Sequence, residues 1–266
     1  RAIGLRHALL IAPAKEMVLP EFYPHQKGRT SPVEQVLARA RPDHHVAHPV
    51  EELRAPTFRT FRVCDTHWTS KGAMLGLLAV LKSLGLNSEE VGTLFEADKY
   101  KETEHSGDLG SKVFPSQSAK EQVLTGAYYR KWVEYDNLLP NMGRVIVIRN
   151  TGALYPTKCM IFGSSSSYSF FDYVSRVFSE VIFIHSAGSI DFGVVAQERP
   201  DYLIAQTNGR FVVRPPTTEY SLAGEILEKW ERLDTTLQTR VTERHTYKGE
   251  EDLTATRYHR MLPFFD

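Results

Sequence analysis

The sequence predicts an α/β fold built on a mostly parallel β-sheet, and three observations lead to this prediction. Strand-like apolar runs alternate with helix-like runs through the second half of the chain, as in GRVIVIRN, KCMIFG and EVIFIH. Polar loops, DTHWTSKG and GSSSSYS, join a strand-like run to a helix-like run in two places. The 266 residues, 42% of them hydrophobic, suffice for a sizeable core.

The first third of the chain begins with an apolar strand from Ala8 to Ile11, which breaks into a loop punctuated by prolines. A short helix follows in SPVEQVLARA, with Ser31 as N-cap and Pro32 at its first position. The alternation in TFRTFRV predicts a strand over residues 57–63. An apolar helix then runs from DTHWTSKG to Gly85.

The rest of the chain divides into three parts. Residues of about 87–142 are polar and irregular, and we expect an insertion there with a short helix or two. Strands and helices then alternate up to residue 215, which closes the predicted catalytic domain of residues 1–215. An apolar stripe over Ser221 to Arg240 predicts one helix docked on the body, in a C-terminal helix and tail of residues 216–266.

Charge and composition narrow the classes of function. Lys plus Arg and Asp plus Glu both number 32, so no excess of basic residues supports nucleic-acid binding. No apolar run is long enough to span a membrane, and no signal peptide is recognisable, although the chain begins at Arg1 and this says nothing of targeting. Cys64 and Cys159 lie in apolar runs and are expected to be buried thiols.

The serine run at residues 164–167 lies between the apolar run CMIFG and a helix with Tyr168, Phe171, Val174 and Phe178 at helical spacing. A Ser-rich segment is often a flexible connector, but these flanks indicate a sharp strand-to-helix turn. Such a turn lifts a nucleophile above the carboxyl end of a sheet.

Asp65 and His67 are two residues apart at the end of the predicted strand, so their side chains project to the same side. A carboxylate can then orient the imidazole, and a serine on the other turn would complete a nucleophilic triad. Asn208 follows the strand DYLIAQ and is a candidate donor to an oxyanion. His44, His45 and His48 are interpreted as surface histidines, and no metal site is predicted.

At these residues the chain resembles the SGNH-hydrolase-like polysaccharide O-acetyltransferases, a family typified by the periplasmic alginate O-acetyltransferases. DTHWTSKGA resembles the Asp-x-His-Trp motif of that family, and IFGSSSSYSFFDYVSRVFSEV resembles its nucleophile block. IAPAKEMVLPEFYP, SGDLG and ERPDYLIAQTNGR are similar to further segments, so the resemblance covers about residues 6–213. It implies a three-layer fold in which the Asp-His block precedes the serine block, a circular permutation of the usual SGNH order.

The resemblance implies a role for each matching residue. Ser165 falls on the nucleophile, His67 on the general base and Asp65 on the carboxylate that orients it. Gly188 and Asn208 fall on oxyanion donors. Since Ser164 stands where the family carries Asp, Ser166 and Ser167 stay open as alternative nucleophiles.

Two aromatic residues are candidates for contact with substrate. Trp68 either stacks on a sugar ring or packs against the following helix, and Tyr168 either faces substrate or covers the core. Both interpretations of each residue stay open at this point.

The implied function is transfer of an acetyl group to a hydroxyl of a polysaccharide or oligosaccharide through an acyl-serine. The alternatives are a carbohydrate acetyl esterase with the same triad and a non-catalytic glycan-binding relative. No tightly bound cofactor is expected, and the acetyl donor is open between acetyl-CoA and an acetylated membrane partner such as an O-acyltransferase. The resemblance implies a periplasmic location, and a cytoplasmic one stays open.

Overall fold

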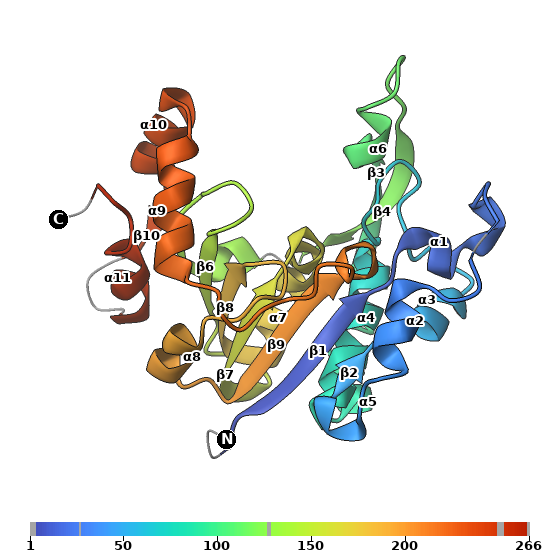
Figure 1. The fold of residues 1–266 in the computed structure, drawn as a ribbon, viewed down its shortest axis with the longest axis horizontal. Coiled ribbons are helices and arrows are strands. Elements are labelled where there is room, and N and C mark those ends of the chain that lie inside the picture. Colours follow the sequence, from blue (N-terminus) through green and yellow to red (C-terminus); the bar gives the residue numbers. More distant parts are fainter. Residues whose placement is uncertain (1–3, 27, 127–128, 249–252, 265–266) are drawn as a thin grey trace.

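A computed structural model describes residues 4–26, 28–126, 129–248 and 253–264 (Figure 1). Its main sheet has the strand order β10-β5-β6-β8-β7-β9-β1-β2. The strands are β1 (Arg6–Ala12), β2 (Val46–Ala47), β5 (Val133–Asp136), β6 (Val145–Arg149), β7 (Tyr155–Gly163), β8 (Phe178–His185), β9 (Tyr202–Asn208) and β10 (Thr246–Tyr247). Strands β8, β7, β9, β1 and β2 run parallel, and the β6 side of the sheet is antiparallel. The predicted mostly parallel sheet is confirmed.

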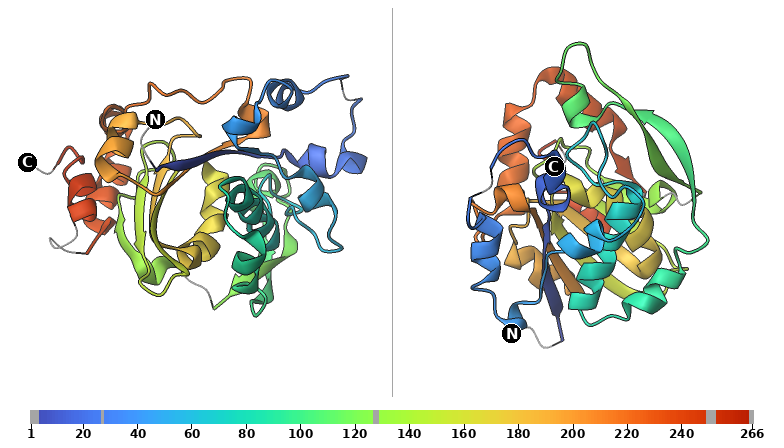
Figure 2. Two further views of the ribbon diagram at one scale, coloured as in Figure 1. Left: turned by 90° about the horizontal axis from the view of Figure 1, so that it is seen from below. Right: turned by 90° about the vertical axis from the view of Figure 1, so that its right-hand side faces the viewer.

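Helices cover both faces of this sheet and make three layers (Figure 2). One face packs against α3 (Val50–Arg54), α4 (Ser70–Ser83), α5 (Ser88–Thr93) and α7 (Phe171–Val177). The other face packs against α8 (Phe192–Glu198), α9 (Leu222–Arg232), α10 (Thr235–Arg244) and α11 (Leu253–His259). Helix α2 (Pro32–Leu37) packs beside β1 through Val33 and Ile11.

The position of β7 inside the sheet explains why all four residues of the run CMIF are apolar. Cys159 and Ile161 belong to the apolar cluster on the α4 face, whereas Met160 and Phe162 belong to the cluster on the opposite face. Since successive side chains of a strand point to opposite faces, a strand covered on both sides has to be apolar throughout. All four of these side chains are fully buried.

The sequence predicted one helix start correctly and missed another. Ser31 caps α2 in a capping box with Glu34, as its sequence indicated. The single helix predicted over residues 221–240 is wrong: it divides into α9 and α10, because the Asp234 side chain accepts a hydrogen bond from the backbone of Leu237 and starts a new helix.

The strand predicted over residues 57–63 is also wrong. That segment forms no regular strand and has only an isolated bridge between Phe61 and Trp68. The Thr60 carbonyl accepts instead from the Thr69 N–H, and the Arg62 N–H donates to the His67 carbonyl. These bonds fold the chain back on itself into a tight loop before α4.

The region predicted as an irregular insertion contains an antiparallel hairpin of β3 (Lys99–His105) and β4 (Ala119–Thr125). Together with α6 (Gly107–Gly110) between its strands, we call this hairpin the β3–β4 arm, and it projects from the body of the molecule (Figure 1). The end of the same region supplies β5 to the main sheet.

Short helical turns complete the structure: α1 (Lys15–Val18), η1 (Pro20–Phe22), η2 (Pro42–His44), η3 (Tyr129–Trp132), η4 (Ser165–Phe170) and η5 (Gly209–Phe211). The C-terminal segment contributes β10, which pairs with β5, while the predicted domain boundary near residue 215 stays a prediction. Within the described residues, no helix has the length and apolar character needed to cross a membrane.

Candidate active site

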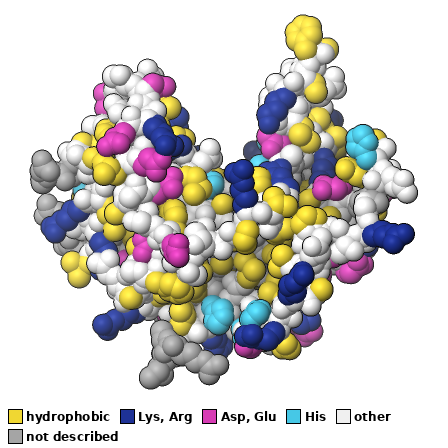
Figure 3. All heavy atoms as spheres, viewed as in Figure 1, with side chains coloured by type: hydrophobic (Ala, Val, Ile, Leu, Met, Phe, Trp, Pro, Cys, Tyr) yellow, Lys and Arg dark blue, Asp and Glu magenta, His cyan; other side chains and the backbone are white. Residues whose placement is uncertain are grey.

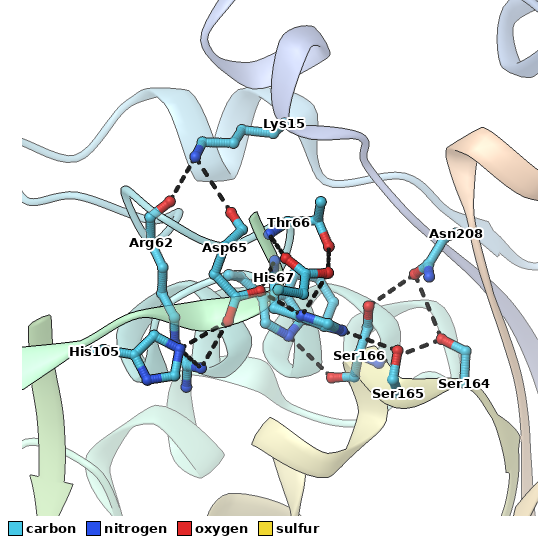
Figure 4. A network of polar contacts seen from close by, with 12 residues as sticks. Lys15, Arg62, Asp65, Thr66, His67, His105, Ser164, Ser165, Ser166 and Asn208 are labelled. Atoms are coloured by element: carbon cyan, nitrogen blue, oxygen red, sulfur yellow. Dashed lines mark hydrogen bonds and ion pairs between the residues drawn. The ribbon is translucent and has the colours of Figure 1, made fainter. Parts of the chain in front are cut away.

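The predicted site residues meet at the edge of the sheet where its parallel strands end. Ala12, the last residue of β1, lies opposite Asn208, the last residue of β9. Gly163 ends the neighbouring strand β7, and the serine turn starts directly after it. The carboxyl ends of parallel strands are where ligands bind in open α/β sheets. The loop before α4 brings Asp65 and His67 over this edge (Figure 4).

His67 contacts both other members of the predicted triad. Its Nδ1 lies 2.6 Å from Asp65 Oδ1, and its Nε2 lies 2.9 Å from Ser165 Oγ (Figure 4). The Asp65 Oδ1 atom also accepts the backbone N–H of His67 at 2.9 Å, which fixes the carboxylate against the ring. With the proton of the imidazole on Nδ1 facing the carboxylate, Nε2 is free to accept the proton of the Ser165 hydroxyl.

Each of the four serines in the turn has a different environment. Ser164 and Ser167 are buried and both donate their hydroxyls to Gln206 Oε1, at 2.8 and 2.7 Å. Ser166 is buried and donates to Asn208 Oδ1 at 2.8 Å. Ser165 alone among the four is partly exposed and faces His67. The geometry therefore favours Ser165 over Ser166 and Ser167 as the serine that His67 can deprotonate.

Gly163 is required where the turn begins. A Cβ at this position would lie 2.3 Å from Ser167 Oγ and 2.9 Å from the Phe183 ring. The turn itself is closed by a hydrogen bond from the Ser167 N–H to the Ser164 carbonyl, at 2.9 Å. Ser165 is the first residue of η4, so its N–H has no acceptor within the turn and is a candidate donor to an oxyanion.

The second oxygen of Asp65 has partners of its own. His105 Nε2 lies 2.8 Å from Asp65 Oδ2, and Arg62 Nη1 lies 3.4 Å from the same oxygen. Burial on its own would raise the pKa of Asp65, which is 4% exposed. Hydrogen bonds from the side chains of His67 and His105 outweigh burial and hold the pKa of Asp65 well below its usual range. This carboxylate therefore stays ionised beside His67.

The loop that carries Asp65 and His67 is held from two sides. Lys15 donates its ammonium group to the carbonyls of Arg62, Val63 and Asp65, at 2.6, 2.8 and 3.2 Å. From the other side, the Asp108 carboxylate accepts the backbone N–H of Thr66 at 2.7 Å and also its hydroxyl. These contacts leave the loop little freedom to move the imidazole.

Among the described residues, Asp65, His67 and Asp108 offer a group of potential metal ligands whose atoms lie within 4.8 Å of one another. Asp65 and His67 are already joined by their 2.6 Å hydrogen bond, and Asp108 already accepts two hydrogen bonds from Thr66. A metal ion would have to replace these bonds. The donor set fits a hydrogen-bonded proton-transfer site better than a metal centre.

The two predicted oxyanion residues differ in their surroundings. Asn208 is 6% exposed, and its Nδ2 has no hydrogen-bond partner among the described residues, while it lines a cavity of about 60 Å³ beside Ser166. Gly188 is buried, has φ +97°, and a Cβ there would lie 3.0 Å from Pro216 and 3.2 Å from the Gln206 carbonyl. The positive φ and these close contacts explain why residue 188 is a glycine. The role of Gly188 as an oxyanion donor stays a prediction.

Trp68 does not offer a face to substrate, which corrects the prediction that it stacks on a sugar ring. Its side chain is 2% exposed and packs on Phe170, with ring centroids 5.1 Å apart. Glycines on α4 make room for the indole, since a Cβ at Gly76 would lie 2.8 Å from the ring. The indole N–H donates to the Ser166 carbonyl at 3.0 Å. Trp68 thus joins the serine turn to α4 from inside the core.

Tyr168 lines the cleft next to Ser165. Its hydroxyl lies 2.9 Å from His185 Nδ1, and the Arg144 guanidinium lies 5.4 Å from the centre of its ring. Burial, followed by the charges of Arg144 and Lys229, lowers the pKa of His185 to about 4. The pKa of Tyr168 is raised to about 12 by burial. Tyr168 therefore donates to a neutral His185.

This cleft has a volume of about 420 Å³ and lies between β4 and the helical segment that follows the serines. In the same view as Figure 1, the surface is hollowed between the β3–β4 arm and helices α9 and α10 (Figure 3). The walls of the cleft carry hydroxyl groups, aromatic rings and charged groups. The lining residues are Arg62, Asp65, His67, Ser70, Val123, Leu124, Ser165, Tyr168, Ser169, Asp172 and Tyr173.

Four residues that hold the site were missed as site residues: Lys15, Arg62, His105 and Asp108. Lys15 and Asp108 lie in IAPAKEM and SGDLG, which the resemblance had singled out without giving them a role. His105 stands immediately before SGDLG, and Arg62 lies in the segment read as a strand. Their contacts with Asp65 and its loop join segments 40 to 50 residues apart in the chain, except for Arg62.

Several solved structures have an architecture similar to that of this chain. Bacillus cereus PatB1 matches over 79% of this chain and 84% of its own, with 12% identity and a TM-score of 0.56. A DHHW family protein from Eubacterium siraeum matches over 79% and 80%, with 11% identity and a TM-score of 0.55. The O-acetyltransferase domain of Pseudomonas putida AlgJ matches over 90% and 84%, with 13% identity and a TM-score of 0.53.

The chain has the fold of these proteins. The expected resemblance to SGNH-like O-acetyltransferases is thereby confirmed at the level of the fold. No family model matches the sequence, and no curated protein matches it significantly. Function has to be argued from the residues of this site, because one fold hosts many activities.

Proposed function

We propose that the protein transfers an acetyl group from a donor to a carbohydrate hydroxyl, through a covalent intermediate on Ser165. One observation carries this proposal: His67 lies between Asp65, at 2.6 Å, and Ser165 Oγ, at 2.9 Å, with the polarity that a nucleophilic triad needs. The fold shared with an O-acetyltransferase domain supports the reaction class.

The first half-reaction forms the acetyl-serine. Ser165 Oγ attacks the acetyl carbonyl carbon of the donor as its proton passes to His67 Nε2, and the ionised Asp65 stabilises the imidazolium. The tetrahedral intermediate then collapses, and the leaving group takes the proton from His67. In the second half-reaction an acceptor hydroxyl gives its proton to His67 and attacks the acetyl carbon, which returns a protonated Ser165.

The negative charge on the carbonyl oxygen needs donors close to Ser165. The N–H of Ser165 and the Nδ2 of Asn208 are candidates, because the first has no acceptor within its turn and the second has no partner among the described residues. A buried amide without a partner costs about 1 to 3 kcal/mol in a resting protein, a cost that a functional role would explain. Gly188 is kept as a third proposed donor.

The serine at position 164 does not argue against catalysis. Ser164 hydrogen-bonds to Gln206 through both its backbone and its hydroxyl, and these bonds hold the turn closed without an aspartate. The retained contacts among Asp65, His67 and Ser165 favour an enzyme over a non-catalytic glycan-binding relative.

The cleft next to Ser165 supports a carbohydrate acceptor. Tyrosine rings and serine hydroxyls suit stacking and hydrogen bonding to sugar, and a volume of about 420 Å³ is within the range of small-ligand sites. With Trp68 buried, we propose Tyr168 as the aromatic residue that contacts the acceptor. The acetyl donor is proposed to be acetyl-CoA or an acetylated membrane O-acyltransferase.

The test uses a chromogenic acetate ester as donor, with and without candidate oligosaccharides. We expect slow cleavage of the ester alone, because the acetyl-enzyme waits for an acceptor, and faster consumption together with acetylated sugar once the right glycan is added. Mass spectrometry of the products detects the transferred acetyl group, and Ser165→Ala serves as the inactive control.

Fast cleavage of the ester that no glycan accelerates would instead identify a hydrolase. Ready removal of acetyl groups from an acetylated polysaccharide, without a transfer product, would do the same. The chemistry of the triad is shared by both activities, so only the fate of the acetyl group separates them.

A further inference from the structure

Asp65 lies between two imidazoles. Its Oδ1 contacts His67 Nδ1 at 2.6 Å, and its Oδ2 contacts His105 Nε2 at 2.8 Å (Figure 4). The proposed reaction uses only His67. His105 is the last residue of β3, next to α6 of the β3–β4 arm, and its side chain is 34% exposed, so it is no core residue that merely fills space.

The distances decide which atom of His105 carries the proton. A carboxylate only accepts, so a 2.8 Å contact with Asp65 Oδ2 requires a hydrogen on His105 Nε2. Arg62 Nη1 lies 3.1 Å from the same nitrogen, but a guanidinium only donates and this nitrogen is already a donor. Arg62 therefore acts on Asp65 Oδ2, at 3.4 Å, and His105 supplies the shorter hydrogen bond.

Helix α6 of the arm, which follows His105, packs closely against the loop that carries Asp65 and His67, so His105 is held in place. The N–H groups of Leu109 and Gly110 donate to the Cys64 carbonyl, at 3.2 and 2.9 Å. Gly107 has φ +67°, and a Cβ there would lie 2.4 Å from the Cys64 carbonyl oxygen and 2.6 Å from Asp65 Cβ. Backbone thus packs on backbone at this contact, which explains the glycines of SGDLG.

We propose that His105 is a positioning residue of the triad: its Nε2–H holds Asp65 Oδ2, which turns Oδ1 toward His67 and makes the β3–β4 arm part of the catalytic machinery. This inference rests on the proposed function for its role in a reaction. The arm is then a structural requirement of activity and not only a wall of the cleft.

Other charged groups surround this pair. Arg62 and Lys15 face Asp65, Asp108 Oδ2 lies 3.9 Å from His67 Nδ1, and Glu121 accepts the N–H of Val63 in the same loop. Without His105, the longer contact of Arg62, at 3.4 Å, is the one left on Asp65 Oδ2 among the described residues. The carboxylate is then held less firmly, and Oδ1 is no longer fixed against His67 Nδ1.

The test compares His105→Ala with His105→Gln, whose amide nitrogen can donate in place of Nε2. The matched control is Lys101→Ala, an exposed residue of the same strand. Two rates are measured at neutral pH: cleavage of a chromogenic acetate ester, and labelling by a sulfonyl fluoride. Thermal unfolding of each variant shows whether the arm remains folded.

We expect His105→Ala to lower both rates about ten- to a hundredfold at neutral pH, the loss that a misplacement of about 1 Å typically causes. His105→Gln should restore most of the rate, and Lys101→Ala should behave as the unaltered protein. A residue with only a structural role would not be rescued by a side chain that merely returns a donor to Asp65 Oδ2.

The proposal is overturned if His105→Ala keeps the full rate, or if a folded His105→Gln loses as much as His105→Ala. The rate of labelling by the sulfonyl fluoride separates this result from a failure of the proposed function, because labelling needs an activated serine and no glycan. Slower labelling in His105→Ala that His105→Gln restores, without any acetyl transfer to glycans, would support the positioning role and reject the transferase.

Discussion

Replacing His67 with alanine is expected to lower the rate of acetyl transfer about a thousandfold, the loss usual for a member of a serine triad. In the proposed mechanism the imidazole accepts the Ser165 proton, and its Nε2 lies 2.9 Å from the hydroxyl. Its side chain is 20% exposed and contributes little to the core, so the free energy of unfolding should change little. Initial rates with an acetate ester and glycan, together with urea unfolding, measure both quantities.

Asp65→Asn is the companion variant. An amide in place of the carboxylate cannot stabilise the imidazolium and offers a donor where an acceptor is needed, so a loss of similar size is expected. Exposed Lys101→Ala on the arm is the control for unspecific effects. Near-full turnover in either His67→Ala or Asp65→Asn would remove the triad assignment.

Replacing Trp68 with alanine is expected to lower the free energy of unfolding by about 3 to 5 kcal/mol, the usual cost of deleting a large buried aromatic side chain. The indole is 2% exposed and fills the space left by Gly76, and its N–H bonds the Ser166 carbonyl. Its loss should therefore destabilise the protein and weaken ester cleavage and acetyl transfer together. Urea unfolding and the two assays measure these effects.

Trp230→Ala provides a comparison on the far side of the molecule. Trp230 lies on α9 and packs on Phe264, with ring centroids 4.7 Å apart, so its loss should affect stability without affecting the rate of the folded protein. If Trp68→Ala remained as stable as the original protein and lost only transfer to glycan, the stacking role that the sequence suggested would be restored.

The sequence could predict the candidate site because the signals for its residues are local. One signal is an apolar strand that ends in Gly163 directly before a serine run, and the other is an Asp-x-His pair directly before an apolar helix. Both lie in loops that enter a helix, and in a parallel sheet such loops meet at the carboxyl ends of the strands. The choice among the serines needed coordinates, since the environment of Ser166 and Ser167 depends on Gln206 and Asn208 of another strand.

The β3–β4 arm and its contacts could not be predicted in the same way. The polar strand KYKETEH has no buried face to give it a period of two, since only Tyr100 and His105 are partly buried and its other side chains are exposed. The role of His105 depends on a carboxylate 40 residues earlier in the chain. Trp68 was misjudged for a related reason, because its burial depends on glycines one and two turns into α4.

The most direct test of the account is peptide mapping by mass spectrometry after treatment with a sulfonyl fluoride. The account predicts one adduct, on Ser165, that is absent from Ser165→Ala and is formed far more slowly in His67→Ala. An adduct on Ser166 or Ser167 would move the nucleophile within the turn, whereas no adduct together with undiminished acetyl transfer in Ser165→Ala would contradict a covalent mechanism.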